Sequence, residues 1–218
     1  MVRSIIRCDD VFVDSDATQF KKICEIIRRC DFDHLVGITP LGEGRKLWAE
    51  KGLVWRVTLR RYGPFINSRI LKMTGEECIG NNVQLLKVLN TEFSSGAIPA
   101  LHGLHHYRYD VMDQERVYHE LSTGVKLLRK LFNFDVKVFA APFNAWDYKT
   151  VVVCKKLNLS IDECFAAVGH ESLRNMNSYQ IEQLAKKQSS LPEVLYHPYQ
   201  MLNLEKFELY LKTRRKHC

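Results

Sequence analysis

The sequence predicts an α/β fold in which helices cover a mainly parallel sheet. Short apolar runs typical of buried strands alternate with longer segments whose apolar residues recur at helical spacing. The 218 residues are enough for one domain with a substantial core, and we expect that domain to span residues 1–218. About six or seven strand–helix units are compatible with a barrel or an open, doubly wound sheet, and both folds place ligands at the carboxyl ends of the strands.

The first part of the chain is predicted to begin with a strand and a capped helix. An apolar run at residues 2–8 is typical of a strand, and the short polar stretch at 14–16 can cap the helix that follows. A second strand is expected at 35–38, and residues 43–80 contain a strand-like run at 53–59. The apolar face of the first helix is predicted to comprise Phe20, Ile23, Cys24 and Ile27.

The same alternation continues to the end of the chain. A helix at about 82–95 is expected to carry Val83, Leu86 and Leu89 on one side, because these residues recur at helical spacing. Further helices are predicted at about 113–131, 150–157, 178–188 and 204–214, and further strands at 97–101, 136–142, 163–168 and 193–198.

Composition and cysteine spacing argue against a membrane-spanning, secreted or disulfide-linked protein. Hydrophobic residues make up 46% and charged residues 26% of the chain, and no apolar run approaches the ~20 residues of a membrane helix. The N-terminus lacks the pattern of a secretory signal, and the seven cysteines are scattered without C-x-x-C spacing. We therefore expect a reduced, cytoplasmic protein. The net charge of +7 fits either a solvated surface or attraction to an anionic ligand.

Polar side chains gather where the predicted strands end. The first strand is followed by Asp9 and Asp10, the strand at 97–101 by His102, and the last strand by His197. The strand at 136–142 runs into the turn PFNAW. Because the carboxyl ends of parallel strands meet at one edge of a sheet, we expect these groups to converge.

Three histidines in ALHGLHHY raise the question of a metal site. His102 and His106 are four residues apart, and His102 and His105 are three apart, so either pair can share one face of a helical turn. Two imidazoles and one carboxylate would leave a coordination position open, as in catalytic zinc sites, and Asp10 can supply that carboxylate. A surface turn with solvated histidines is the alternative.

The paired acids and the last histidine also have two interpretations each. Asp9 and Asp10 can serve turn geometry and helix charge, or one can bind a cation while the other acts as a base. His197 precedes a proline and is either structural or able to donate a proton near neutral pH.

Four motifs in this order resemble the polysaccharide deacetylases, the NodB-homology group of carbohydrate esterases, and above all their divergent branch. These motifs are IIRCDDV, ALHGLHHY, FAAPFNAWD and VLYHP. The resemblance extends from Ile5 to about Leu211 and implies a distorted or incomplete (β/α) barrel of about seven strands. It also implies metal-dependent removal of an N- or O-acetyl group from a sugar.

The resemblance implies a role for each motif residue. Asp9 corresponds to the catalytic base and His197 to the general acid. The divalent metal, with zinc expected, would be bound by Asp10, His102 and His106. His105 has no family role and is expected beside the ligands or the substrate. The substrate-binding residues implied by the proline motif are Pro142, Phe143, Asn144 and Trp146, and a backbone N–H near Phe143 would form part of the oxyanion site.

Two features depart from the family pattern. The family carries an arginine two residues before the motif proline, where it tethers the catalytic base, and here that position is Ala140. The aspartate–tryptophan motif that holds this arginine is not recognisable near 161–165. Arg7 alternates onto the same strand face as Asp9 and is a candidate substitute.

Three hypotheses for function follow. The first is a cytoplasmic, metal-dependent deacetylase acting on a carbohydrate, such as a nucleotide- or lipid-linked sugar of surface-polysaccharide synthesis. The second is a catalytically inactive relative that binds carbohydrate, which the missing arginine favours. A nucleic-acid binder is not expected, because only the net charge supports it and no aromatic–basic recognition motif is present. Composition and motifs leave the oligomeric state open.

Overall fold

The computed structural model describes residues 4–42, 77–162, 173, 175–198 and 203–217. Within these residues, the chain forms a parallel six-stranded sheet with the strand order β7-β6-β5-β2-β1-β8. The strands are β1 (Ile5–Val11), β2 (Asp33–Ile38), β5 (Ile98–Leu101), β6 (Val138–Ala140), β7 (Ser160–Asp162) and β8 (Glu193–Tyr196). A short antiparallel pair, β3 (Leu41–Gly42) and β4 (Glu77–Cys78), stands apart from this sheet.

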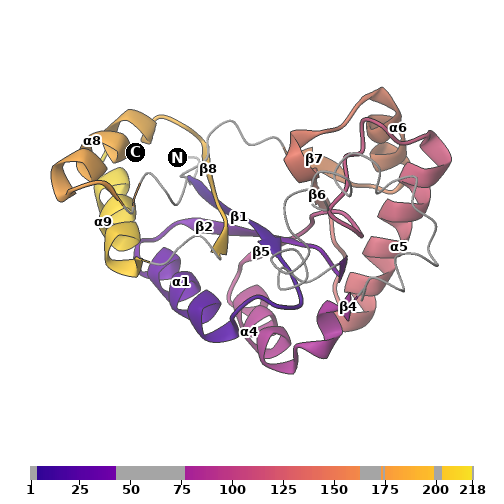
Figure 1. Ribbon diagram of the computed structural model, residues 1–218, viewed down its shortest axis with the longest axis horizontal. Helices are drawn as coiled ribbons and strands as arrows, with labels where there is room; N and C mark the ends of the chain where they lie inside the picture. The colour runs from indigo at the N-terminus through magenta and orange to yellow at the C-terminus, as the bar shows by residue number, and fades with distance from the viewer. Residues whose placement is uncertain (1–3, 43–76, 163–172, 174, 199–202, 218) are drawn as a thin grey trace.

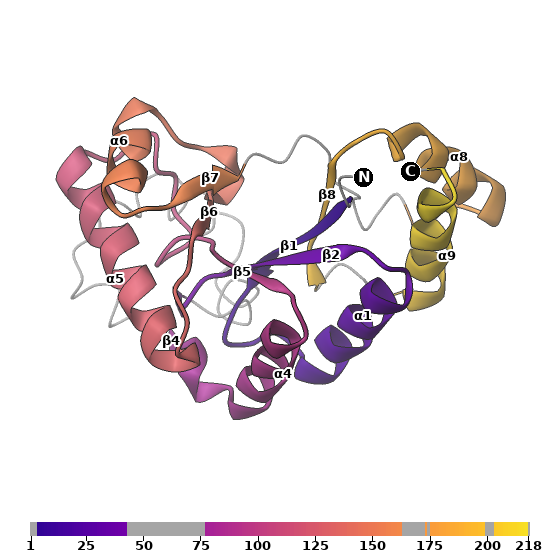
Figure 2. The same ribbon diagram turned by 180° about the vertical axis from the view of Figure 1, so that it is seen from behind.

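Helices surround the outside of the curved sheet (Figure 1). Asp16 caps the first helix by accepting hydrogen bonds from the backbone N–H groups of Thr18 and Gln19, as the polar stretch at 14–16 predicted. The view from behind shows the start of β1 near the last helix, beside β8 (Figure 2), and Arg214 of that helix donates a hydrogen bond to Ser4 just before β1. The helices are α1 (Ala17–Arg29), α4 (Val83–Ser94), α5 (Gln114–Phe132), α6 (Tyr148–Lys156), α8 (Ser178–Gln188) and α9 (Leu204–Arg215). No helix among the described residues is long and apolar enough to cross a membrane.

The sheet is curled into an incomplete barrel. Arg7 on β1 contacts Asp162 on β7 with 3.2 Å between Nη1 and Oδ2. These strands are four positions apart in the sheet, and four strand spacings in a flat sheet would separate them by about 19 Å. The contact therefore runs across the interior of a curved sheet. The expected α/β fold is confirmed, and the incomplete barrel is the alternative that this chain adopts.

The two faces of the sheet differ in composition. The main core lies between the outer face and the helices, and the inner face carries a much smaller apolar cluster centred on Leu35, Ala100 and Ala140. On β1, Ile6 and Cys8 belong to the main core. Strand alternation therefore turns Arg7 and Asp9 toward the inner face.

Several predicted boundaries need correction. The first strand continues through Asp9 and Asp10 to Val11, with an irregularity between Cys8 and Val11, so the acid pair belongs to the strand. Val83, expected on the same side of α4 as Leu86 and Leu89, is the first residue of this helix and is 59% exposed. Strand β7 was not predicted, and the strands expected at 53–59 and 163–168 lie outside the described residues.

Candidate active site

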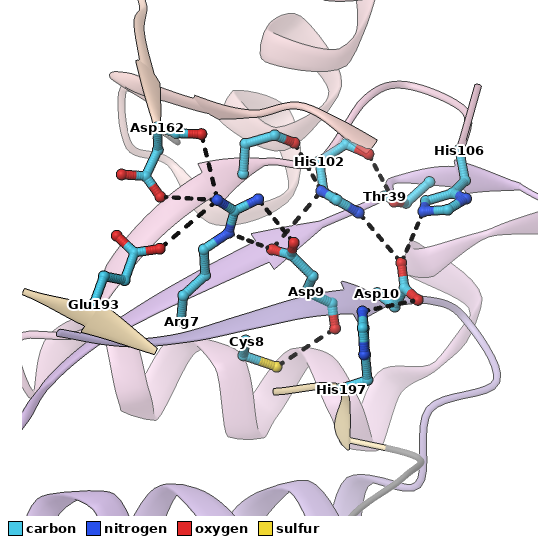
Figure 3. A network of polar contacts seen from close by, with 11 residues as sticks. Arg7, Cys8, Asp9, Asp10, Thr39, His102, His106, Asp162, Glu193 and His197 are labelled. Atoms are coloured by element: carbon cyan, nitrogen blue, oxygen red, sulfur yellow. Dashed lines mark hydrogen bonds and ion pairs between the residues drawn. The ribbon is translucent and has the colours of Figure 1, made fainter. Parts of the chain in front are cut away.

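Polar or motif residues lie at the carboxyl end of each of the six strands, along one edge of the sheet. Asp10 lies near the end of β1, His102 directly follows β5, and His197 directly follows β8. The other three strands end at or just before Thr39, Ala141 and Asp162. Figure 3 shows that the side chains of Asp9, Asp10, His102, His106 and His197 point toward one another. The convergence expected from the strand ends is therefore observed.

Asp10, His102 and His106 converge on one point. The Nε2 atoms of His106 and His102 lie 2.9 and 3.2 Å from the same oxygen, Oδ1 of Asp10. One potential ligand atom from each of the three residues lies within 4.8 Å of the other two. The histidine pair four residues apart is thus the one that the fold brings to the acid.

The hydrogen bonds of His102 prepare it to bind a cation. Its Nδ1–H donates to the backbone oxygen of Ala140 at 2.7 Å, which directs Nε2 at Asp10. An imidazole nitrogen and a carboxylate oxygen at such distances hold either a proton or a cation between them. A divalent cation fits this donor set, because zinc accepts histidine nitrogen and carboxylate oxygen together.

Electrostatics keep the carboxylate ionised at this point. Burial alone would raise the pKa of Asp10, but His106 and His102 hold it well below its usual value. Burial would lower the pKa of His102, but Asp9 and Asp10 raise it above its usual value. Burial lowers the pKa of His106 despite the neighbouring Asp10. The site therefore presents an anionic oxygen and a neutral His106 ring.

Backbone strain is concentrated at the same place. Six described non-glycine residues have positive φ angles. Three of them are Asp or Asn residues just after helices, where this conformation is common, namely Asp31, Asn133 and Asn158. The other three are at the candidate site, namely Asp10, Phe143 and Asn144. Such residues cost about 1–3 kcal/mol each and cluster at functional sites, which supports a functional role for this edge.

Arg7 holds Asp9 from inside the barrel. Its Nε and Nη2 groups each donate to one oxygen of the Asp9 carboxylate at 2.8 Å. Its Nη1 group donates to the Asp162 carboxylate at 3.2 Å and lies 3.7 Å from the Glu193 carboxylate. Arg7 is fully buried, yet Asp9 and the other two carboxylates raise its pKa against the effect of burial. A bidentate pair of this kind fixes the orientation of Asp9.

Small residues lie on the inner face that also carries Arg7 and Asp9. Ala100 and Ala140 lie on the inner face with no exposed surface. A Cβ atom at Gly37 would lie 2.8 Å from Oδ1 of Asp9, so a larger residue there would displace the carboxylate. Position 140, where the resemblance led us to expect an arginine, is alanine, and the arginine that contacts Asp9 is Arg7 on β1. Asp162 contacts this arginine at 3.2 Å, although no aspartate–tryptophan motif is recognisable near 161–165.

His105 has a different environment from its two neighbours. Its Nδ1 lies 2.9 Å from Oε2 of Glu120 on α5, which also pairs with Arg116 at 2.9 Å. Its ring stacks on Tyr107, with centroids 5.1 Å apart. These contacts join the histidine loop to α5, and the expectation that His105 lies beside the ligands or the substrate stays a prediction.

Of the remaining predicted residues, His197 and Phe143 contact the cluster. Nε2 of His197 is 3.7 Å from Oδ2 of Asp10, and its side chain is 26% exposed. Phe143 is exposed and packs its ring against His106, with centroids 4.4 Å apart. Asn144 is exposed and Pro142 is buried, whereas Trp146 is half-buried and packs against the main core. Phe143 and Asn144 are thus the members of the proline motif that face solvent.

The backbone conformation at position 103 requires a glycine in the sequence HGLHH. Gly103 has a φ of +79°, and a Cβ atom there would lie 2.4 Å from the backbone oxygen of His105. Only glycine adopts this conformation without strain, and the resulting turn brings His106 back toward His102.

Replacing Gly103 with alanine should therefore destabilise the protein by more than about 1 kcal/mol, since both strain and a backbone clash arise. Gly96→Ala is the matched control, because Gly96 has a φ of +101° but no atom within 4 Å of the point that a Cβ would occupy. Urea unfolding of both variants measures the difference. Equal destabilisation would show that the clash at position 103 is absent.

The polysaccharide deacetylase family model matches residues 69–161 of this chain. This span includes the histidine and proline motifs. The predicted resemblance to polysaccharide deacetylases is confirmed. No curated protein matches the chain.

Solved structures of such enzymes share the fold. A family 4 carbohydrate esterase from Streptomyces lividans, in complex with acetate, has 12% identity and a TM-score of 0.62, with 99% of this chain and 86% of that chain covered. A family 4 pseudoenzyme from Bacillus anthracis has 11% identity and a TM-score of 0.62, with coverages of 98% and 61%. A mutant peptidoglycan deacetylase from Bacillus subtilis has 8% identity and a TM-score of 0.57, with coverages of 99% and 81%.

Proposed function

We propose that this protein is a metal-dependent hydrolase that removes an N- or O-acetyl group from a sugar, a glycan or a sugar conjugate. The observation that carries the proposal is the convergence of Asp10, His102 and His106 beside Asp9 and His197. The resemblance to polysaccharide deacetylases supports the substrate class. Asp10, His102 and His106 would hold the metal, with zinc expected from the donor set.

A bound divalent cation would supply Lewis-acid polarisation of the acyl carbonyl. Asp9 then accepts a proton from the attacking water. Both of its oxygens already accept one hydrogen bond from Arg7, and a carboxylate has further lone pairs available for the proton. Arg7 thus orients the base without consuming its capacity to act.

His197 is placed to complete the reaction. It lies at the more exposed side of the cluster, where its Nε2 can donate a proton to the departing sugar amine or hydroxyl. The backbone N–H near Phe143 would stabilise the oxyanion, because the positive φ of Phe143 reorients the backbone beside His106. Exposed Phe143 and Asn144 offer contacts for the sugar, and we retain Pro142 and Trp146 as proposed substrate-binding residues.

The alternative is an inactive carbohydrate-binding relative. The pseudoenzyme among the solved structures of this fold favours it. Against it stands the tether of Asp9, since Arg7, Asp162 and Glu193 supply the charges that an ordered catalytic base needs. We therefore favour the enzyme, and further propose a cytoplasmic nucleotide- or lipid-linked sugar of surface-polysaccharide synthesis as its substrate.

The decisive experiment measures acetate release from acetylated sugars and from an aryl acetate, with zinc, cobalt and nickel supplied in turn to the purified full chain. Asp10→Asn should abolish release on every substrate, because it removes the charged ligand at the centre of the cluster. Asp135→Asn is the control, since Asp135 lies on the surface beside Arg129. If the unmodified protein binds acetylated sugar but releases no acetate with any metal, the inactive alternative is correct.

A further inference from the structure

A second cluster of ligand-type side chains lies outside the candidate active site. It consists of Cys24 on α1, His34 near the start of β2 and Glu92 on α4, all at least 94% buried. One potential ligand atom from each residue lies within 4.8 Å of the other two. We propose that this cluster binds a second divalent metal ion of borderline-soft character, with zinc as the expected ion.

The position of the cluster separates it from the active site. His34 is the second residue of β2, whereas the active-site residues lie where the strands end. Cys24 belongs to the main core on the outer side of the sheet, and Arg7 and Asp9 lie on the inner side. The two sites therefore lie at opposite ends of the parallel strands and share no residue.

His34 is the residue that points to a ligand. Its Nε2 lies 3.0 Å from the hydroxyl of Tyr196, and its Nδ1 is buried with no hydrogen-bond partner in the described part of the chain. Burial, aided by the charge of Arg28, lowers the pKa of His34 to about 3. The ring is therefore neutral. With the proton on Nε2 donated to Tyr196, Nδ1 holds an unused lone pair, as a histidine ligand requires.

Cys24 and Glu92 complete a donor set with balanced charge. Burial first, and then Glu92, raise the pKa of the Cys24 thiol, so without a cation this thiol stays protonated and is a poor nucleophile. A divalent ion displaces that proton, and the thiolate and the Glu92 carboxylate together neutralise its charge. Burial of a neutral set of this kind avoids the large cost of burying an unpaired charge.

Arg28 does not prevent metal binding. Its Nη2 pairs with Oε1 of Glu92 at 2.5 Å, which leaves the second carboxylate oxygen of Glu92 for the ion. The Arg28 side chain is 50% exposed, so it can also move into solvent. The pairing holds Glu92 in place in the same way that an outer hydrogen bond orients a metal-binding carboxylate.

A cavity gives the ion access and room for a fourth ligand. Its volume is about 190 Å³, and Cys24, His34 and Glu92 are among the residues that line it. Arg28 and Asp33 line it as well. Zinc with three protein ligands takes a water molecule in the fourth tetrahedral position, and this cavity can hold one. Thiolate with imidazole favours zinc over magnesium or calcium, which prefer oxygen alone.

Cobalt spectroscopy distinguishes the two sites. The active-site cluster has only nitrogen and oxygen donors, whereas the second cluster has sulfur. Chelator-treated full-length protein titrated with Co²⁺ should therefore develop a thiolate-to-cobalt charge-transfer absorption, and elemental analysis after zinc loading should give two ions per chain. Cys24→Ser should remove the absorption and one of the two ions. Cys154→Ser is the matched control, because Cys154 is a buried free cysteine on another helix, α6.

Each outcome decides the proposal. No thiolate absorption in the unmodified protein overturns it, as does an absorption that survives in Cys24→Ser. Should Cys24→Ser fail to fold by circular dichroism, Glu92→Gln, which keeps the size of the side chain, should weaken cobalt binding at the thiolate site at least 10-fold, and unchanged binding would overturn the proposal. If the active-site cluster binds no metal but the second cluster does, elemental analysis should give one ion per chain, and the thiolate absorption should remain.

Discussion

Replacing Arg7 with methionine should lower kcat/KM by about 100-fold or more, because a misplaced catalytic group costs rates of this order. Arg7 makes two hydrogen bonds to Asp9 and none to the proposed metal ligands. The loss should therefore fall mainly on kcat, while metal content stays unchanged. Steady-state kinetics on an acetylated sugar, together with elemental analysis, measure both quantities.

A second substitution separates positioning from stability. Arg7→Met leaves Asp9, Asp162 and Glu193 without their buried cation, and such losses destabilise proteins by about 3–5 kcal/mol. Adding Ala140→Arg to Arg7→Met puts an arginine at the family position and should recover part of kcat. Ala140→Arg alone should destabilise the protein, because Ala140 is fully buried and a larger side chain there would overpack the inner face. If the double variant regains stability but no turnover, Arg7 is structural only.

Converting Asp9 to asparagine should reduce turnover by about 10²–10⁴-fold, the usual contribution of a positioned general base. The amide cannot accept the proton from water. Asp10, His102 and His106 are untouched, so metal content should remain that of the unmodified protein. Acetate release and metal analysis on the same preparation test both statements.

Asp162→Asn is the graded control for this experiment. Asp162 contacts Arg7 but not Asp9, so its amide variant loosens the tether while the base stays ionised. Its loss of turnover should be smaller than that of Asp9→Asn. Loss of metal from Asp9→Asn would instead make Asp9 a ligand, and unchanged turnover would remove it from the mechanism.

Much of the fold and the candidate site follows from local sequence patterns. Apolar runs predicted most of the strands and apolar residues at helical spacing predicted most of the helices, because the spacing of apolar residues depends on which side of an element is buried. The rule that parallel strands bring their carboxyl ends together then placed Asp10, His102 and His197 at one edge. Spacing alone did not choose between His105 and His106, because both fit one helical turn, and the choice of His106 came from the family resemblance. The actual backbone, with Gly103 at positive φ, is not a helix.

The sequence by itself determined the α/β class, the order of the motifs and the residues that meet at the strand ends, since each depends on a short stretch of chain. Only the tertiary structure decided that Arg7 tethers Asp9 with help from Asp162 and Glu193. Arg7 and Asp162 are 155 positions apart, and their contact exists because the sheet curls until β1 faces β7. The same holds for Cys24, His34 and Glu92, which come from three separate elements and meet only after α1 and α4 pack on the sheet. Contacts of this kind depend on packing between distant segments, which no local pattern of residues encodes.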